Sequence, residues 1–283
     1  MQRSLRPLLL ALPLFAALAC ASSGEPIAVE SRPVAVALRL GGAGVGEGAL
    51  IGLPGGRSFE YDPATLRLLR VREGDFARRE GESLVPTGDV VQEREAAGGE
   101  PLARITGSPP LVARLEGVWV RDLASPVDST RRRPTPGLTY ALVDPEGVVR
   151  ARIEESVRAI EMEDGWGFVR SFLVKPGPYP CELALDLVQP IGGLGPSGVV
   201  TTGNARRQDW SLESGGRAVQ AVHRSKPTVY QRLTKSQPRG VRYDARRAYV
   251  DLDRSPIRFE IAEQYVTEWS DDTPRALDAA LRR

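Results

Sequence analysis

The sequence predicts an all-β fold: an antiparallel β-sandwich, plain or supersandwich-like, with a short C-terminal helix. Three observations support this prediction. Runs rich in β-branched and aromatic residues come in pairs with turn sequences between them. One long run near the C-terminus alternates apolar and polar residues, as a half-buried strand does. Helix signals are few, which together with many short strands favours a sandwich.

Turn chemistry predicts two hairpins in the middle of the chain. Asp144-Pro145-Glu146-Gly147 has Asp first, Pro second and Gly fourth, which is the preference of a type I turn. Asp164-Gly165 is a hairpin turn sequence because both of its residues tolerate positive φ. The strands joined by these turns are predicted at 140–143 with 148–153, and at 157–163 with 166–174.

The last predicted strand has two distinct faces. The further predicted strands are Val34 to Leu40, Leu111 to Leu123, Cys181 to Val188, Ala248 to Leu252 and Ile257 to Trp269. In the last of these, one face carries Ile257, Phe259, Ile261, Tyr265 and Trp269, and the other carries Arg258, Glu260, Gln264 and Glu268. Thr273-Pro274 then predicts an N-cap followed by proline at the first helical position, opening a helix to Arg282.

The first residues have the three parts of a signal peptide. Arg3 and Arg6 give a positive start, Leu8 to Phe15 is apolar, and small residues close the segment at Ala17-Leu18-Ala19. The apolar run is shorter than the roughly 20 residues that a membrane-spanning helix needs. The sequence therefore predicts an exported protein with a signal peptide at 1–19, and cleavage after Ala19 with simple secretion is one alternative.

The next residue suggests a membrane anchor. Ala17-Leu18-Ala19-Cys20 resembles the bacterial lipobox, whose cysteine is acylated, although Ala17 stands where leucine is usual. The resemblance implies lipidation at Cys20. The small and polar residues that follow predict a tether over 20–32, and the strand pattern predicts a single large β-sandwich-like domain over 33–283. We therefore expect a cell-envelope protein anchored to a membrane, on its periplasmic or outer-membrane face.

Charge and cysteine counts exclude several classes of function. The chain has 38 basic and 36 acidic residues, and because Arg3 and Arg6 lie in the leader the mature chain is neutral. Nucleic-acid binding normally demands a basic excess, so we expect no nucleic-acid partner. The cysteines are Cys20 and Cys181 alone, which leaves no disulfide framework once Cys20 is acylated. We expect Cys181 to be a buried, inert thiol.

The single histidine limits the chemistry further. His223 cannot complete a Cys/His zinc site with so few cysteines, and no Cys-x-x-Cys-His occurs, so we expect no metal, no haem and no other cofactor. No Gly-x-Ser-x-Gly elbow is present, and we name no catalytic residue. His223 is interpreted as a surface or strand-edge residue. Carboxylates alone could still serve a glycosidase.

Four residues are the candidate ligand-binding residues. Trp210 follows a polar stretch and is the best candidate for an exposed aromatic that could stack on a sugar. Tyr249, Asp251 and Asp253 share one face of a predicted strand, where the two aspartates could contribute to a calcium site, although a solvated strand face explains them as well.

Other charged pairs and runs have simpler interpretations. We interpret Glu154-Glu155 and Asp271-Asp272 as surface and capping charges. Arg131-Arg132-Arg133 is interpreted as a solvated loop, with contact to anionic envelope groups as the alternative.

One motif resembles a known family. Ala49-Leu50-Ile51-Gly52-Leu53-Pro54-Gly55-Gly56 leads into Phe59-Glu60-Tyr61-Asp62-Pro63-Ala64, and Gly74-Asp75-Phe76 follows. This order resembles an uncharacterised β-rich domain of exported planctomycete-type proteins, often found beside c-type cytochrome or sugar-oxidising modules. The resemblance covers about residues 45–175 and implies fold and compartment, with no activity attached. Leu66 and Arg72 stand where the family often has cysteine and tryptophan. By itself, Leu53-Pro54-Gly55-Gly56 predicts a tight turn, because its glycines allow unusual backbone angles.

These features together favour one function over two alternatives. We expect a non-catalytic, membrane-tethered binding or interaction module outside the cytoplasm, for carbohydrate or for a partner envelope protein. One alternative is a carboxylate-based carbohydrate-active enzyme on the same fold, and the other is a purely structural envelope lipoprotein.

Overall fold

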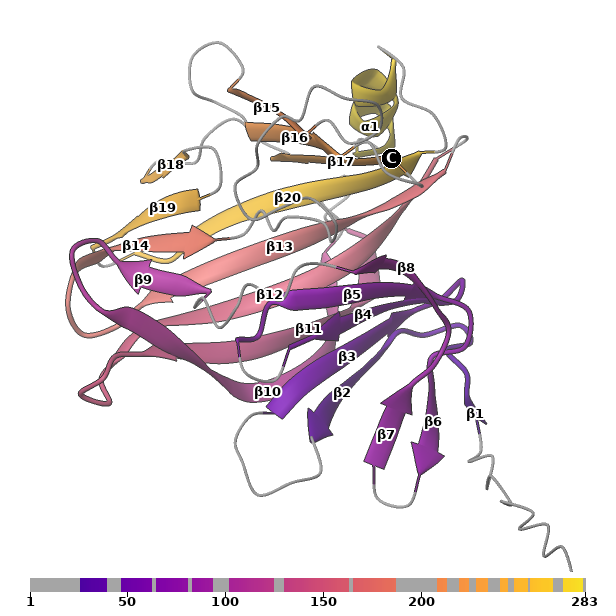
Figure 1. The fold of residues 1–283 in the computed structure, drawn as a ribbon, viewed down its shortest axis with the longest axis horizontal. Helices are drawn as coiled ribbons and strands as arrows, with labels where there is room; N and C mark the ends of the chain where they lie inside the picture. Colours follow the sequence, from indigo (N-terminus) through magenta and orange to yellow (C-terminus); the bar gives the residue numbers. More distant parts are fainter. Residues whose placement is uncertain are drawn as a thin grey trace, which may run out of the picture.

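The computed structural model (Figure 1) describes fourteen segments of the chain. They are residues 26–39, 47–62, 65–80, 83–93, 102–124, 130–162, 165–186, 208–212, 219–223, 228–233, 240–243, 247–253, 255–266 and 272–281. The predicted signal peptide, Cys20 and the start of the predicted tether lie outside these segments.

The described residues form three antiparallel sheets and one helix, which confirms the predicted fold class. The five-stranded sheet has the order β2-β3-β4-β5-β8, with β2 at Val34–Arg39, β3 at Glu47–Leu53, β4 at Arg57–Tyr61, β5 at Leu68–Glu73 and β8 at Asp89–Glu93. The three-stranded sheet has the order β1-β6-β7, with β1 at Pro26–Ile27, β6 at Ala77–Glu80 and β7 at Ser83–Pro86.

The large sheet has twelve strands among the described residues, in the order β15-β16-β17-β20-β13-β12-β11-β10-β9-β14-β19-β18. Their bounds are β9 Ala103–Ile105, β10 Pro110–Ala124, β11 Arg132–Val143, β12 Val149–Glu161, β13 Trp166–Pro176, β14 Cys181–Asp186, β15 Gln208–Leu212, β16 Val219–His223, β17 Thr228–Leu233, β18 Val241–Tyr243, β19 Arg247–Leu252 and β20 Ile257–Val266. In Figure 1 this sheet curves behind the five-stranded sheet, and the short helix α1 (Thr273–Leu281) lies near β17 and β20.

The two predicted hairpins are present. Strands β11 and β12 pair across the turn at Asp144 to Gly147, where the Gly147 N–H donates to the Asp144 carbonyl at 3.0 Å. Strands β12 and β13 pair along their whole length up to Gly165, which has a φ of 98°. Short-range turn chemistry therefore located the centre of the large sheet correctly. Contrary to expectation, Arg132 and Arg133 begin strand β11 and are not part of a loop.

The C-terminal helix begins one residue earlier than predicted. The Ala276 N–H donates to the Asp272 carbonyl at 2.9 Å, so Asp272 occupies the N-cap position that the sequence assigned to Thr273. Leu277 of this helix packs on Ile160 and Ala262, which lie on the outer face of the large sheet. The helix therefore covers an outer part of β20 that the alternating pattern predicted to be solvated, where Ala262 is fully buried and Gln264 is 1% exposed.

Two apolar layers hold the three sheets together. The main core lies between the large sheet and the five-stranded sheet, and Phe59 and Tyr61 enter it from the same face of β4, as their spacing predicts. The second core, built around Leu50, Phe76 and Ala77, lies between the five-stranded and three-stranded sheets. Strands β2 and β3 of the five-stranded sheet therefore contribute to both cores.

A charged cluster lies inside the main core. The Arg170 Nε donates to Glu155 Oε1 at 2.7 Å, and the Tyr61 hydroxyl donates to the same oxygen at 2.7 Å. The Tyr140 hydroxyl donates to Glu155 Oε2 at 3.3 Å, and Glu155 has no exposed surface. Burial lowers the pKa of the Arg170 guanidinium, but Glu155, Tyr61 and Glu263 together outweigh burial, so the pKa is raised and the side chain stays charged. The interpretation of Glu155 as a surface charge was therefore wrong, because it shares the inward face of β12 with Ile153 and Val157.

Ionisation of the two buried tyrosines should make the fold sensitive to alkali. Burial, and then the Glu155 charge, raise the pKa of Tyr61 and Tyr140 well above 10.0. A raised folded-state pKa contributes stability that is present below the unfolded pKa and lost as pH rises, so we expect stability to fall above about pH 10. Each phenol should contribute about 1.4 kcal/mol per pH unit.

Urea unfolding measured from about pH 9 to 11 tests this dependence. The Tyr61→Phe variant should lose about half of the two-tyrosine slope, whereas Tyr179→Phe, at an exposed position, should keep the wild-type slope. An unchanged slope in Tyr61→Phe would show that its hydroxyl already ionises in the folded protein.

Candidate functional site

A tight turn marks one end of the sandwich, as the motif predicted. Residues Pro54 to Gly56 connect β3 to β4, and Gly55 and Gly56 have φ values of 91° and 74°. These left-handed angles favour glycine because other residues carry a Cβ that crowds the backbone. The turn is therefore fixed by its sequence.

Three connections meet closely beside this turn. The Gly74 N–H, between β5 and β6, donates to the Gly56 carbonyl at 2.7 Å. A Cβ on Gly56 would lie 3.3 Å from the Gly74 carbonyl oxygen. A Cβ on Gly88, between β7 and β8, would lie 2.8 Å from the carbonyl oxygens of Glu73 and Asp75. Glycine at these positions lets three loops approach backbone to backbone.

Gly52 supports the same region from inside β3. A Cβ at this position would lie 2.5 Å from Val29 Cγ2 and 2.6 Å from Phe76 Cδ2. The absence of a side chain lets Val29, from the N-terminal segment, and Phe76, from the β5–β6 connection, pack against the sheet. Phe76 is 2% exposed as a result.

The Gly52→Ala variant is therefore expected to lose about 1–3 kcal/mol of unfolding free energy, because the added methyl group overpacks this contact. Urea unfolding measures the loss. Gly117→Ala is the matched control, since a Cβ at Gly117 meets nothing within 4 Å. Equal stability of the two variants would contradict the packing role of Gly52.

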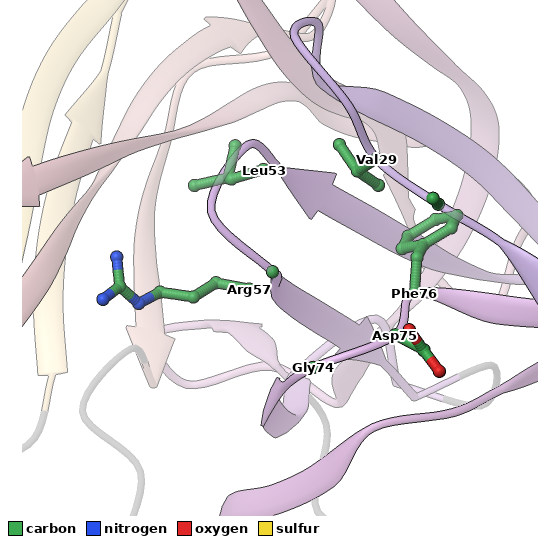
Figure 2. Close-up of a pocket in the computed structure, with 8 residues that line it drawn as sticks. Val29, Leu53, Arg57, Gly74, Asp75 and Phe76 are labelled. Carbon is green, nitrogen blue, oxygen red and sulfur yellow. The ribbon is translucent and has the colours of Figure 1, made fainter.

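A pocket of about 190 Å³ opens at this end of the molecule (Figure 2). Val29, Leu53 and Phe76 give it an apolar wall, and Gly56 and Gly74 contribute backbone. Figure 2 shows the Arg57 guanidinium directed away from the apolar wall. The exposed Asp75 carboxylate lies beside the Phe76 ring.

Arg57 joins the pocket to an aromatic stack. Its guanidinium lies 4.6 Å from the centre of the Trp166 ring, and the Trp166 ring stacks on Tyr265 at 4.1 Å with a 4° angle between the planes. The Arg57 Nε is buried and has no hydrogen-bond partner. Trp166, 9% exposed, belongs to the main core. Arg57 thus connects the pocket lining to the aromatic part of the main core.

The arrangement suits binding of an apolar group better than covalent chemistry. Asp75 is the one carboxylate among the residues that line the pocket. Glycoside hydrolysis generally needs a pair of carboxyl groups, about 5–10 Å apart, across the scissile bond. The pocket wall supplies contacts that desolvate a small apolar side chain.

Trp210 and the other three predicted ligand-binding residues lie on or beside strands that do not pair with each other. Trp210 lies in β15, the first strand of the large sheet's order, and the placement of its side chain is outside the described structure. Tyr249 and Asp251 lie in β19, the eleventh strand of that order, and Asp253 follows the strand. Asp251 and Asp253 are exposed, whereas their neighbours Val250 and Leu252 are fully buried. The simpler prediction of a solvated strand face fits this pattern, and none of the four residues lines the pocket.

Cys181 differs from its prediction in one respect. Its side chain is half-buried, since it stands at the start of β14 beside the core, and it forms no disulfide. Burial, together with the Asp251 charge, raises the pKa of the thiol despite the opposing charge of Arg150. The thiolate, which is the reactive form, is therefore disfavoured at neutral pH, in agreement with an inert cysteine.

Two further kinds of feature are absent from the described segments. No cluster of three or more histidine, cysteine, aspartate or glutamate side chains there is arranged to hold a metal ion. No helix within the same segments has the length and apolar character needed to cross a bilayer. The side chain of His223 lies outside the described structure.

The sequence predicted the turn but not the pocket. Gly52, Gly74 and Phe76 belong to the glycine-containing motif between residues 49 and 76, and they line or support the pocket. The sequence did contain a signal for the pocket, namely the recurrence of glycines and one phenylalanine at the ends of strands. No family model, no curated protein and no solved structure matches the chain. The residues around the pocket are therefore the main evidence for a functional site.

Proposed function

We propose that the chain is a membrane-tethered, extracytoplasmic binding module that takes an apolar side chain of a partner envelope protein into the pocket beside the β3–β4 turn. The observation that carries this proposal is the composition of that pocket, three apolar side chains beside one exposed carboxylate. The N-terminal segment that leads back to Cys20 also lines the pocket, through Ala28 and Val29. A partner in the same membrane would therefore meet the pocket close to the tether.

A peptide fits this pocket better than a sugar does. Sugars are usually bound by stacking on an exposed aromatic face together with several polar groups. The Phe76 ring is 2% exposed and packs on Gly52, so too little of its face is open for a sugar to stack on it. Asp75 is exposed at the rim and would attract a lysine or arginine next to the bound side chain. The preferred ligand is a segment with an apolar residue flanked by a basic one.

Peptide and glycan arrays probed with the mature chain from Ala21 onward test the proposal. That chain keeps every described residue. We expect it to select peptides with an apolar residue beside lysine or arginine. Ala28→Trp should lower the affinity at least tenfold by filling the pocket mouth, and Asp75→Lys should remove the preference for basic peptides.

Val112→Trp is the control for the first variant, because Val112 is 62% exposed and lies outside the pocket. Binding to glycans and to no peptide would show that the ligand is a carbohydrate and not a peptide. Glycan hydrolysis lost in a carboxylate variant would favour the enzyme, and silence of both arrays would favour a structural lipoprotein. Metabolic labelling with radioactive palmitate tests the tether separately, and an unlabelled protein would remove it.

A further inference from the structure

The end of the β10–β11 hairpin gathers arginines and exposed apolar residues. We call this surface the arginine end and define it by Val120, Arg121, Leu123, Arg131, Arg132 and Arg133. Val120 is 41% exposed and Leu123 is 36% exposed. The three consecutive arginines are exposed as well. Leu123 pairs with Arg133 across the hairpin, so an apolar and a basic side chain stand side by side.

Positive charge is concentrated at the arginine end. Between Val118 and Pro136 the sequence has four arginines and two aspartates, whereas the mature chain as a whole is neutral. Arg133 also lies near Arg158 on the neighbouring strand. Burial, and then the charge of Arg133, lower the pKa of Arg158 although Glu260 opposes them. Such crowding of like charges favours an anionic partner.

The predicted tether leads to the same end. Arg32, just before β2, lies 4.0 Å from Asp122 of β10. Cys20 lies six positions before Pro26, where β1 begins and the chain pairs with β6. Six residues span at most about 20 Å when extended, and from Pro26 the chain leads on to Arg32. An acylated Cys20 would thus keep the arginine end close to the bilayer and raise its effective concentration there.

We propose that the arginine end rests on the anionic lipid surface of the membrane to which the chain is tethered. The arginines bind lipid phosphates, and Val120 and Leu123 enter the headgroup layer between them. This inference rests on the proposed function, because the tether determines which membrane is met. It adds an orientation: the hairpin end faces the membrane, and the β11–β12 turn at the opposite end of these strands faces away.

Cosedimentation of the mature chain from Ala21 onward with lipid vesicles tests this binding without the acyl group. We expect binding to phosphatidylcholine vesicles that contain phosphatidylglycerol, and little binding to phosphatidylcholine alone. Raising the salt to about 0.5 M should remove most of the binding by screening. The triple variant R131Q/R132Q/R133Q should bind about a hundredfold more weakly.

The triple variant R114Q/R152Q/R258Q is the matched control. It removes the same charge from exposed arginines away from the arginine end, so it should bind within about threefold of wild type. Leu123→Ser should weaken binding, whereas Val112→Ser should not. A Leu123→Trp variant should shift its fluorescence to the blue on anionic vesicles.

Three results would overturn the inference. They are equal binding by the two triple variants, equal binding to neutral vesicles, and tight binding to immobilised heparin with none to anionic vesicles. The last result would identify a soluble polyanion in place of the membrane. Vesicle binding without palmitate labelling would overturn the acyl tether and leave the lipid-binding surface. Palmitate labelling without vesicle binding would overturn the lipid-binding surface and leave the tether.

Discussion

Replacing Arg170 with methionine is expected to lower the unfolding free energy by about 3–5 kcal/mol at neutral pH. The Arg170 guanidinium is 1% exposed and lies between two carboxyl groups, Glu155 at 2.7 Å and Glu263, whose charge also raises its pKa. Its removal leaves both acids buried without the cation. Glu155→Gln should cost less, because Arg170 still faces Glu263 and the amide oxygen still accepts from Tyr61.

Urea unfolding at neutral pH measures this loss. Arg152→Met is the control, since its ion pair with Glu116 is exposed and should contribute only about 0–1 kcal/mol. A loss in Arg170→Met no larger than in this control would show that the buried cluster does not stabilise the fold.

Replacing Phe59 with alanine is expected to cost about 3–5 kcal/mol. Phe59 has no exposed surface and stands on β4, facing the large sheet. Its ring centre lies 4.6 Å from that of Phe168 at 67°, so it joins the five-stranded sheet to β13. Truncation would leave a cavity between the two sheets, and neither sheet can fill it by itself.

Phe59→Leu keeps most of the volume and should cost about 1.5 kcal/mol or less. Tyr179→Ala, at a position 58% exposed, controls for the loss of an aromatic side chain outside the core. Thermal or urea unfolding of the three variants suffices. A deficit in Phe59→Ala similar to that in Tyr179→Ala would mean that the two sheets do not depend on this contact.

The sequence predicted the strands well because their signals are local. The turn at Asp144 to Gly147 and the glycine at 165 determine where the chain reverses, and alternation determines the inward face. The charged cluster was missed although its signal existed. Glu155 has the same parity as Ile153 and Val157, and Glu263 the same as Ile261 and Tyr265. Only the pairing of β12, β13 and β20 shows that these charges meet.

The candidate site depended on tertiary structure more strongly. Local composition favoured Trp210 and the residues around Asp251, whose strands occupy opposite ends of the order in the large sheet. The pocket is assembled from three stretches, near residues 28, 53–57 and 74–76, that are separated in sequence. The periodicity of the sequence does not predict that these three loops lie together. Each stretch has the sequence of a local turn, and nothing in that sequence indicates a contact with the other two.

The small size of β1 determines how the molecule would respond to pulling at its N-terminus. Only two residues of β1 pair with β6, whereas β2 pairs with β3 over six. Tension applied through residue 25 would therefore peel β1 away first and leave β2 in place. The released segment up to Pro33 could extend by about 25–30 Å. It includes Ala28 and Val29, so the same force would open one wall of the pocket.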